Sequence, residues 1–418
     1  MIRSHRDFRR LWSAAALSQL GSQVSALAIP LTALTVLHAS TFQIGLLTAL
    51  QGAAFLLIGL PAGAWVDRLR RRGVMVAADL ARAALLLSIP LAAWTGALTL
   101  GQLYLVELGT GLCTVFFDVA YQPYLSFLVG RDRLVEGNGR LEASRSASYF
   151  AGPSIAGWLV QVLTAPVAVL VDAASFCWSA GWLAAIRARE PLRTRQSHRT
   201  RLRHDIAEGL RLVLGHPVLR AFALFNAASV LFLSMEHALD IVFLARTLGI
   251  PPTGIGLLYA VASLGAVLGA LAAPPISRRA GQVRTILAAA GIGNTALLLI
   301  PLSRPGPLLA CFVLGSGISS FCIVTNNIVA VAYRQSLCPD RLLGRMNATS
   351  RFLSWGLIPV GALLGGALGT VLGVRTALWV ATAGFATATL VLLAARRHLR
   401  AATPIDPDRA TTVPAAVS

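Results

Sequence analysis

The sequence contains no lysine, so every one of its 36 basic residues is an arginine. This absence excludes a phosphate-binding loop lysine and a Schiff-base lysine, because both chemistries require an amine. Cysteine is also scarce, since only five are present and none forms a CxxC pair. A disulfide framework or a zinc site is therefore not expected. We expect no metal, no cofactor and no enzymatic activity.

Charged residues make up only 13% of the chain, against about 25% in a typical soluble domain. Hydrophobic residues make up 56%, and the mean hydropathy is +0.69. Apolar runs of about 20 residues, long enough to cross a bilayer, recur along nearly the whole chain. The net charge of +19 does not indicate nucleic acid, because the arginines gather in short turns between these runs. The expected surroundings are a lipid bilayer.

The apolar runs predict an all-α integral membrane protein with twelve transmembrane helices in two pseudo-symmetric six-helix bundles. The first run follows a charged tail and is too long for a cleavable signal peptide. The predicted spans are 11–37, 42–65, 74–95, 101–129, 142–163, 166–187, 218–247, 254–276, 284–302, 306–335, 345–371 and 375–395.

The distribution of arginine predicts the orientation of these spans. Arginines crowd the N-terminal tail and alternate turns, near 68–72, 131–140, 187–211, 278–284 and 334–345, whereas the other turns carry only Arg246, Arg304 and Arg375. The arginine-rich side of a membrane protein faces the cytoplasm. We therefore expect a multi-pass protein of the cytoplasmic membrane with both termini in the cytoplasm.

Two segments interrupt or end the apolar pattern. Residues 188–217 are rich in arginine and finish with an amphipathic spacing, so we expect a cytoplasmic linker that ends in a surface helix. Residues 397–418 are rich in alanine, proline and threonine, which predicts a disordered cytoplasmic tail. The two bundles would then occupy 1–187 and 218–396.

The two halves repeat each other. Ser144–Arg145 precedes Pro153 by the same interval as Ser350–Arg351 precedes Pro359, at an offset of 206 residues. Three further matches follow in the same order at offsets of 206 to 208, namely Gly63 with Gly269, Arg71–Arg72 with Arg278–Arg279, and Asp132 with Asp340. Parallel repeats of six helices are typical of transporters whose substrate path runs between the halves.

Four segments are informative together, namely "FRRLWSAAALSQLGSQVSALAIPL", "GAWVDRLRRR", "DIAEGLRLVLGHPVLRA" and "RQSLCPDRLLGRMNATSRF". With them the chain resembles the major facilitator superfamily, in the bacterial branch of macrolide efflux pumps and enterobactin exporters. The second segment is similar to the loop motif G-x-x-x-D-R-x-x-R-R. Two positions depart from the pattern: Arg70 replaces a usual glycine, and Ser22 replaces an acid often found in the first helix.

The resemblance implies a gating latch at Gly63, Asp67, Arg68, Arg71 and Arg72. Asp67 would face the N-terminal end of span eleven, where the partial positive charge of a helix stabilises a carboxylate by about 0.3–1 kcal/mol. The alternative is that the cluster only anchors the orientation of the chain.

Gly152–Pro153 resembles the span-five motif of exporters. Proline removes a backbone hydrogen bond and glycine permits close helix approach, so we expect a pliable seam. Ordinary helix packing is the alternative.

Acidic residues within predicted spans are candidates for proton coupling, because a charge at mid-bilayer costs about 2.5–3.5 kcal/mol. Glu236 and Asp240 lie four residues apart on one helical face, and a shared proton would relieve their repulsion. Glu107 is the second candidate. A structural role for these acids, or exposure at the outer rim, is the alternative. Asp172 is expected to be structural.

The resemblance implies a cavity lined by spans one, four, seven and ten, which suggests Gln19, Gln23, Tyr121, Asn226 and Asn326 as substrate contacts. Alternatively, such amides form hydrogen bonds that hold membrane helices together. We predict a monomeric efflux transporter that exports a small amphipathic drug, siderophore or secondary metabolite in exchange for protons. A uniporter or proton-coupled importer of a small metabolite, and a non-transporting receptor, remain alternatives, whereas the DDxxD metal motif that a lipid transferase needs is absent.

Overall fold

The computed structural model describes residues 6–66, 69–130, 134–188, 210–211, 213–338, 346, 349–350 and 353–401, with the side chains of 60, 64, 134–136 and 138 excepted. The chain is helical in every predicted span. The helices are α1 (Arg6–Thr35), α2 (Thr41–Val66), α3 (Arg71–Trp94), α4 (Leu100–Val129), α5 (Leu134–Leu163), α6 (Ala165–Ala184), α8 (Pro217–Val242), α9 (Pro252–Ala280), α10 (Gln282–Ala296), α11 (Ala310–Leu337), α13 (Ile358–Val371), α14 (Val374–Ala394) and α15 (Arg396–Ala401). Short π- or 3₁₀-helical turns extend three of them, η3 (Phe243–Thr247), η4 (Leu297–Leu302) and η5 (Pro307–Leu309).

Local sequence explains how several helices begin. Thr99 caps α4 by accepting a hydrogen bond from the Gln102 amide at 3.3 Å. Proline occupies the first turn of α6, α8, α9 and α13, where its missing N–H is no loss. Gly281, with φ of 84°, makes the sharp turn between α9 and α10. Proline inside α1 to α5 does not end these helices, as is common in membrane spans.

Some helices are longer than predicted. The span predicted to start at residue 142 belongs to α5, which begins at Leu134, and α1 begins at Arg6 rather than at residue 11. The reason is that charged and polar residues lower the hydropathy of these first turns, although the helical backbone hydrogen bonds continue through them.

Ten helices in the described part are long and apolar enough to cross a membrane, and α1 and α5 are not among them. The number of twelve spans therefore remains a prediction. Large apolar side chains on the outside of the molecule fit a lipid environment, since Leu105, Leu271 and Val371 expose 69%, 71% and 80% of their surface.

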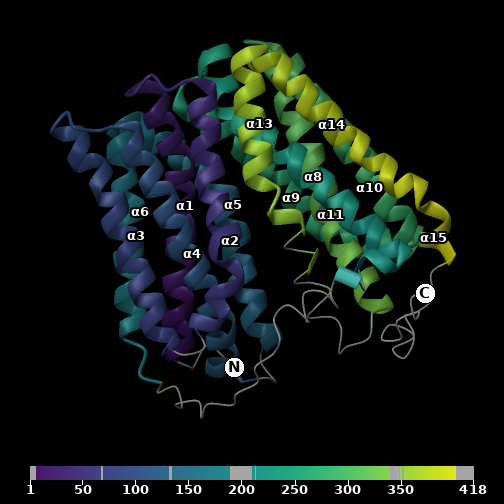
Figure 1. The fold of residues 1–418 in the computed structure, drawn as a ribbon, viewed down its shortest axis with the longest axis horizontal. Helices are drawn as coiled ribbons and strands as arrows, with labels where there is room; N and C mark the ends of the chain where they lie inside the picture. Colours follow the sequence, from purple (N-terminus) through teal and green to yellow (C-terminus); the bar gives the residue numbers. More distant parts are fainter. Residues whose placement is uncertain are drawn as a thin grey trace, which may run out of the picture.

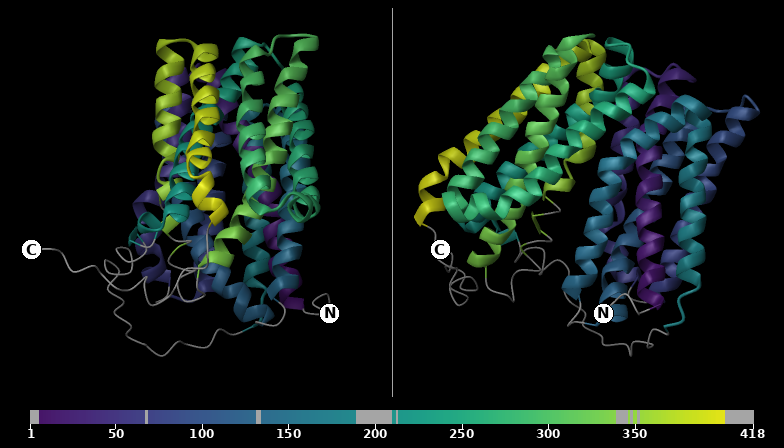
Figure 2. Two further views of the ribbon diagram at one scale, coloured as in Figure 1. Left: turned by 90° about the vertical axis from the view of Figure 1, so that its right-hand side faces the viewer. Right: turned by 180° about the vertical axis from the view of Figure 1, so that it is seen from behind.

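The helices form two groups, α1–α6 and α8–α14, which meet at one end and separate toward the end where α1 begins (Figures 1 and 2). At the meeting end, α2 packs on α13 and α5 packs on α9. The crossing of α5 and α9 is close, because a Cβ atom on Gly157 would lie 2.4 Å from the Pro252 carbonyl oxygen. Thr253 also donates a hydrogen bond to Oε1 of Gln161 at 3.3 Å across this junction.

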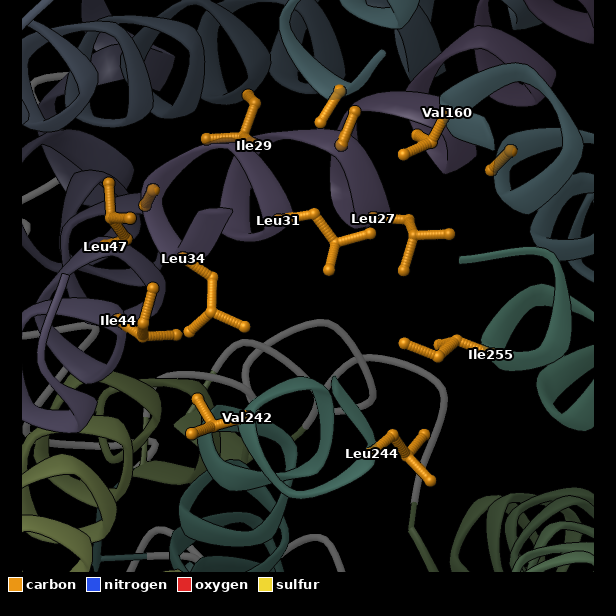
Figure 3. Close-up of a cluster of buried hydrophobic side chains, with 14 of the residues drawn as sticks. Leu27, Ile29, Leu31, Leu34, Ile44, Leu47, Val160, Val242, Leu244 and Ile255 are labelled. Atoms are coloured by element: carbon orange, nitrogen blue, oxygen red, sulfur yellow. The ribbon is translucent and has the colours of Figure 1, made fainter. Parts of the chain in front are cut away.

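The buried cores follow the same division. One apolar cluster joins both halves at the meeting end, and Figure 3 shows Leu27 and Leu31 of α1 projecting toward Leu244 and Ile255 of the C-terminal half. At the other end each half has a core of its own, around Phe8 in one and around Phe222 in the other. The molecule is therefore closed at one end of the interface and divided at the other.

Candidate functional site

The predicted gating latch is described only in part. Asp67 and Arg68 fall outside the described residues, so a contact between Asp67 and span eleven remains a prediction. Arg72, next to Arg71 at the start of α3, donates a hydrogen bond from Nη2 to the carbonyl oxygen of Ala184. A Cβ atom on Gly63 would meet no described atom within 4 Å. The described part of the motif thus ties α3 to the end of α6 within one half.

Gly152 and Pro153 lie where α5 touches both α1 and α9. A Cβ atom on Gly152 would come within 2.5 Å of the Gln23 side chain. The carbonyl oxygen of Pro153 faces Gly256, where an added Cβ would lie 2.3 Å from it. Both residues are closely packed, and Pro153 contributes to the contact between the halves. Their role as a pliable seam remains a prediction.

Glu236 and Asp240 lie one turn apart on α8 and are 3% and 2% exposed. Oε2 of Glu236 and Oδ1 of Asp240 are buried, and each accepts no hydrogen bond from the described residues. The hydroxyl group of Tyr259, on α9, interacts with Asp240. The fold therefore adds a neighbouring phenol to the pair that the sequence predicted.

This acidic pair has a third neighbour and a defined position. Nδ1 of His237 lies 3.5 Å from Oε2 of Glu236, and its side chain is 61% exposed. In the described part of the chain, Glu236, His237 and Asp240 are the group whose ligand atoms, all within 4.8 Å of one another, could hold one metal ion. Leu239 and Val242 of the same helix belong to the cluster that joins the halves. The acids thus lie beside the closed end of the interface.

The second coupling candidate, Glu107, is buried in the N-terminal half on α4. Its acidic neighbour is Asp172 of α6. Asp172 accepts a hydrogen bond from Ser175 at 3.1 Å and packs against Gly21 of α1, where a Cβ would lie 2.7 Å from Oδ1. Glu107 and the pair on α8 are therefore separate sites, one in each half.

A buried ion pair in α3 was missed by sequence reasoning. Asp79 and Arg82 pair three residues apart, and Nη1 of Arg82 also donates to Thr114 at 3.4 Å. The guanidinium carbon of Arg82 lies 4.7 Å from the ring centroid of Phe117 and 4.2 Å from that of Phe176. The available signal was an acid and a base at helical spacing inside an apolar run.

A cavity of about 480 Å³ lies within the C-terminal half, between α8, α10, α11, α14 and the residues Ser350, Ser354 and Trp355. Its polar wall from the first three helices consists of Asn226, Ser229, Asn294, Asn326, Asn327 and Arg334. Two predicted substrate contacts, Asn226 and Asn326, thus share one cavity.

The other predicted contacts, Gln19, Gln23 and Tyr121, are not on its wall and belong to the N-terminal half. Gln23 packs against Gly152 and Tyr121 stacks on Phe117 at 5.8 Å. Their contact with substrate remains a prediction.

Two of the four asparagines that line the cavity are hydrogen-bonded to other helices. Asn294 donates to the Phe385 carbonyl at 3.0 Å, and Asn326 donates to the Ile286 carbonyl at 3.1 Å, so both tie helices together. Trp355, which also lines the cavity, reaches the other half by an edge contact of 5.2 Å with Phe55. The cavity therefore adjoins the interface between the halves.

A family model described as Major Facilitator Superfamily matches residues 11–335 and 237–416. The chain is 29% identical over 341 residues to "Multidrug efflux pump Tap" of Mycolicibacterium fortuitum, covering 79% of this chain and 81% of that protein. It is 23% identical over 385 residues to "Enterobactin exporter EntS" of Escherichia coli O1:K1 / APEC, covering 89% of this chain and 87% of that protein.

Among solved structures, the chain is similar to a bacterial homologue of the iron transporter ferroportin in its inward-facing state. The TM-score is 0.76 at 18% identity, covering 94% of this chain and 98% of that chain. This likeness concerns the fold, and it confirms the predicted arrangement of two helical halves.

Proposed function

Because the chain belongs to the Major Facilitator Superfamily of membrane transporters, we propose that it exports small amphipathic molecules in exchange for protons. Its relatives include a multidrug efflux pump and an enterobactin exporter, which supports the outward direction. The proposed membrane is the cytoplasmic one, with the arginine-rich side and both termini facing the cytoplasm. The divided end of the interface then faces the cytoplasm, so the described state is inward-facing.

The observation that carries the proton proposal is the pair Glu236 and Asp240, which are buried one turn apart beside the closed end. Two adjacent carboxylates cannot both stay charged in an apolar wall at low cost, so a proton held between them stabilises the closed state. Loss of this proton to the cytoplasm would leave two charges on the pair, which favour separation of the halves at this end because outside water can then solvate them. The hydroxyl group of Tyr259, on α9, can donate a hydrogen bond to Asp240 and keep that carboxylate oriented.

The proposed cycle follows from this arrangement. Substrate enters from the divided end, and the acids release to the cytoplasm the proton that they gained from the outside. The halves then rock, so that the cluster around Leu31 and Leu244 parts and the N-terminal ends of α1 and α8 approach each other. Substrate then leaves to the outside, the acids take up a proton there, and the halves return with the pair protonated, so that one proton enters in exchange for the exported substrate.

The test is gradient-driven dye export from a bacterial host that lacks its main pumps. Cells with and without the protein are compared for accumulation of fluorescent amphipathic dyes, and the best dye is then followed in everted vesicles under an imposed pH gradient. We expect Glu236→Gln and Asp240→Asn to lower gradient-driven export by roughly tenfold or more, since each removes a group that carries the proton. The Glu142→Gln variant neutralises an acid whose side chain is 65% exposed and should export normally.

The outcomes separate the parts of the proposal. Undiminished export by both amide variants would place proton exchange elsewhere. Export that persists when an ionophore dissipates the gradient would indicate a uniporter. Dye accumulation that is higher with the protein than without it would indicate an importer.

A further inference from the structure

We propose that the cavity in the C-terminal half binds aromatic compounds that carry an acidic group, with Arg334 as the anchor for the acid. The inference rests on the proposed export function and names the substrate class for it. The cavity differs from the acidic pair on α8, because neither Glu236 nor Asp240 lines it.

The charge on the wall of the cavity indicates which ligand group it would bind. Arg334 is the one charged residue on the described wall of the cavity. Its Nε atom donates to the Ala330 carbonyl of its own helix at 3.3 Å, and its guanidinium carbon lies 5.7 Å from the Phe222 ring centroid. No described carboxylate pairs with it. No hydrogen bond from its two terminal nitrogens to a described residue competes with a ligand, and guanidinium donors match the oxygens of an acid.

The uncharged polar groups of the wall strengthen this preference. Asn226 and Asn327 make no side-chain hydrogen bond to the described residues, so their N–H groups can join Arg334 in binding an oxygen-rich group. Oγ of Ser229 is buried without a hydrogen-bond partner in the same part of the chain. A cationic ligand would find no described carboxylate on this wall and would be repelled by Arg334.

The rest of the wall selects the body of the ligand. Phe225, Ile323, Trp355 and Phe385 line the cavity with aromatic and aliphatic surface. A volume of about 480 Å³ is within the range of small-molecule pockets, and flat rings pack well against such walls. An aromatic system of two or three rings with one acidic group satisfies both parts of the wall.

Cys322, which also lines the cavity, provides a native reporter of its charge preference. In full-length protein with Cys113, Cys177, Cys311 and Cys338 changed to serine, the labelling rates of sulfonatoethyl and trimethylammonioethyl methanethiosulfonate are measured and divided by their rates with 2-mercaptoethanol. We expect the anionic reagent to be favoured, and Arg334→Gln to lower that preference by roughly tenfold. Arg334→Lys should keep most of it.

A matched control removes the same charge elsewhere. Arg284 is exposed at the start of α10, in the same half, and does not line the cavity. Arg284→Gln should leave the preference unchanged, and an equal loss in both glutamine variants would overturn the proposal. Because Cys322 is only 5% exposed, Asn327→Cys in a cysteine-free chain gives a second reporter on an exposed part of the wall. Failure of both reporters to react would mean that ions do not reach the cavity and would also overturn it.

The aromatic part is tested with two ligands that differ by one acidic group. 8-Anilinonaphthalene-1-sulfonate should slow the labelling of Cys322 several-fold, and N-phenyl-1-naphthylamine, which lacks the sulfonate, should slow it much less. The protection should disappear in Arg334→Gln. Equal protection by the two compounds, or protection that survives this substitution, would contradict the proposal. Labelling needs no transport, so failure of the export proposal would leave these rates intact.

Discussion

Arg82 illustrates how one charged residue is accommodated inside an apolar helix bundle. Its guanidinium group lies between the rings of Phe117 and Phe176 and is paired with Asp79, one turn before it. Cation–π contacts of this kind contribute up to about 2 kcal/mol when they are desolvated. The pair therefore joins α3 to α4 and α6 without leaving a lone charge in the bundle.

At this scale we predict that removal of either charge alone, from Asp79 or from Arg82, destabilises the protein. Asp79→Asn or Arg82→Gln should lower the free energy of unfolding by about 3–5 kcal/mol, because each leaves an uncompensated buried charge. The double variant should lose much less than the sum of the two. SDS titration followed by circular dichroism measures these values, and additive losses would show that the two residues act independently.

Helix crossings depend on glycine where the halves meet. Gly157 of α5 and Gly256 of α9 face each other so closely that a Cβ atom on either would lie 3.1 Å from the Cα atom of the other. On the second contact, a Cβ on Gly45 of α2 would lie 2.8 Å from the Cα atom of Gly366 of α13. Small residues permit such approach between membrane helices, and the resulting packing replaces a hydrophobic driving force that lipid does not supply.

For the helices we predict that a single methyl group at the crossing of α5 and α9 weakens their packing. Gly157→Ala should cost about 1–3 kcal/mol of unfolding free energy, because the new Cβ would overlap the Pro252 carbonyl oxygen. The control is Gly181→Ala in α6, where an added Cβ meets no described atom within 4 Å and helix propensity improves. Thermal unfolding in detergent compares the two, and equal stability of both variants would contradict the close crossing.

Apolar clusters of the described residues are of two kinds, shared between the halves or confined to one half. The larger shared cluster holds α1, α2 and α5 against the C-terminal half, while the clusters around Phe8 and Phe222 are confined to their own halves. In the proposed cycle each half would move as a unit, because the contacts between the halves would part while the clusters around Phe8 and Phe222 stay intact. The apolar surface exposed at the closed end would contribute to the energy difference between the two states.

At this scale we predict that fixing the closed end stops transport. Gln161→Cys with Thr253→Cys, in a chain whose native cysteines are serine, places two thiols across the junction of α5 and α9. A short, reducible bismaleimide should abolish dye export from everted vesicles, and a reductant should restore it. The two single variants treated with the same reagent serve as controls. Undiminished export after complete cross-linking would exclude separation of this end during transport.

Much of the fold and part of the site were predictable from the sequence. Apolar runs located the helices, because a backbone in lipid must satisfy its hydrogen bonds within each segment. The extra turns of α5 escaped prediction, since polar residues at an interface lower hydropathy without ending a helix. Glu236 and Asp240 were identifiable because acids are rare in such runs, whereas Tyr259 was not, since a tyrosine in a span carries no comparable signal.

The sequence by itself determined the membrane character, the helical class and the pairing of residues within one helix, because these depend on hydropathy and on spacing along the chain. Only the tertiary structure decided that Asn226 and Arg334 share a cavity, that Tyr259 reaches Asp240 and that Arg82 lies between two rings. These contacts join helices far apart in sequence, and they depend on the rotation of each helix and on how closely its small residues let it approach a neighbour. No local pattern contains that information.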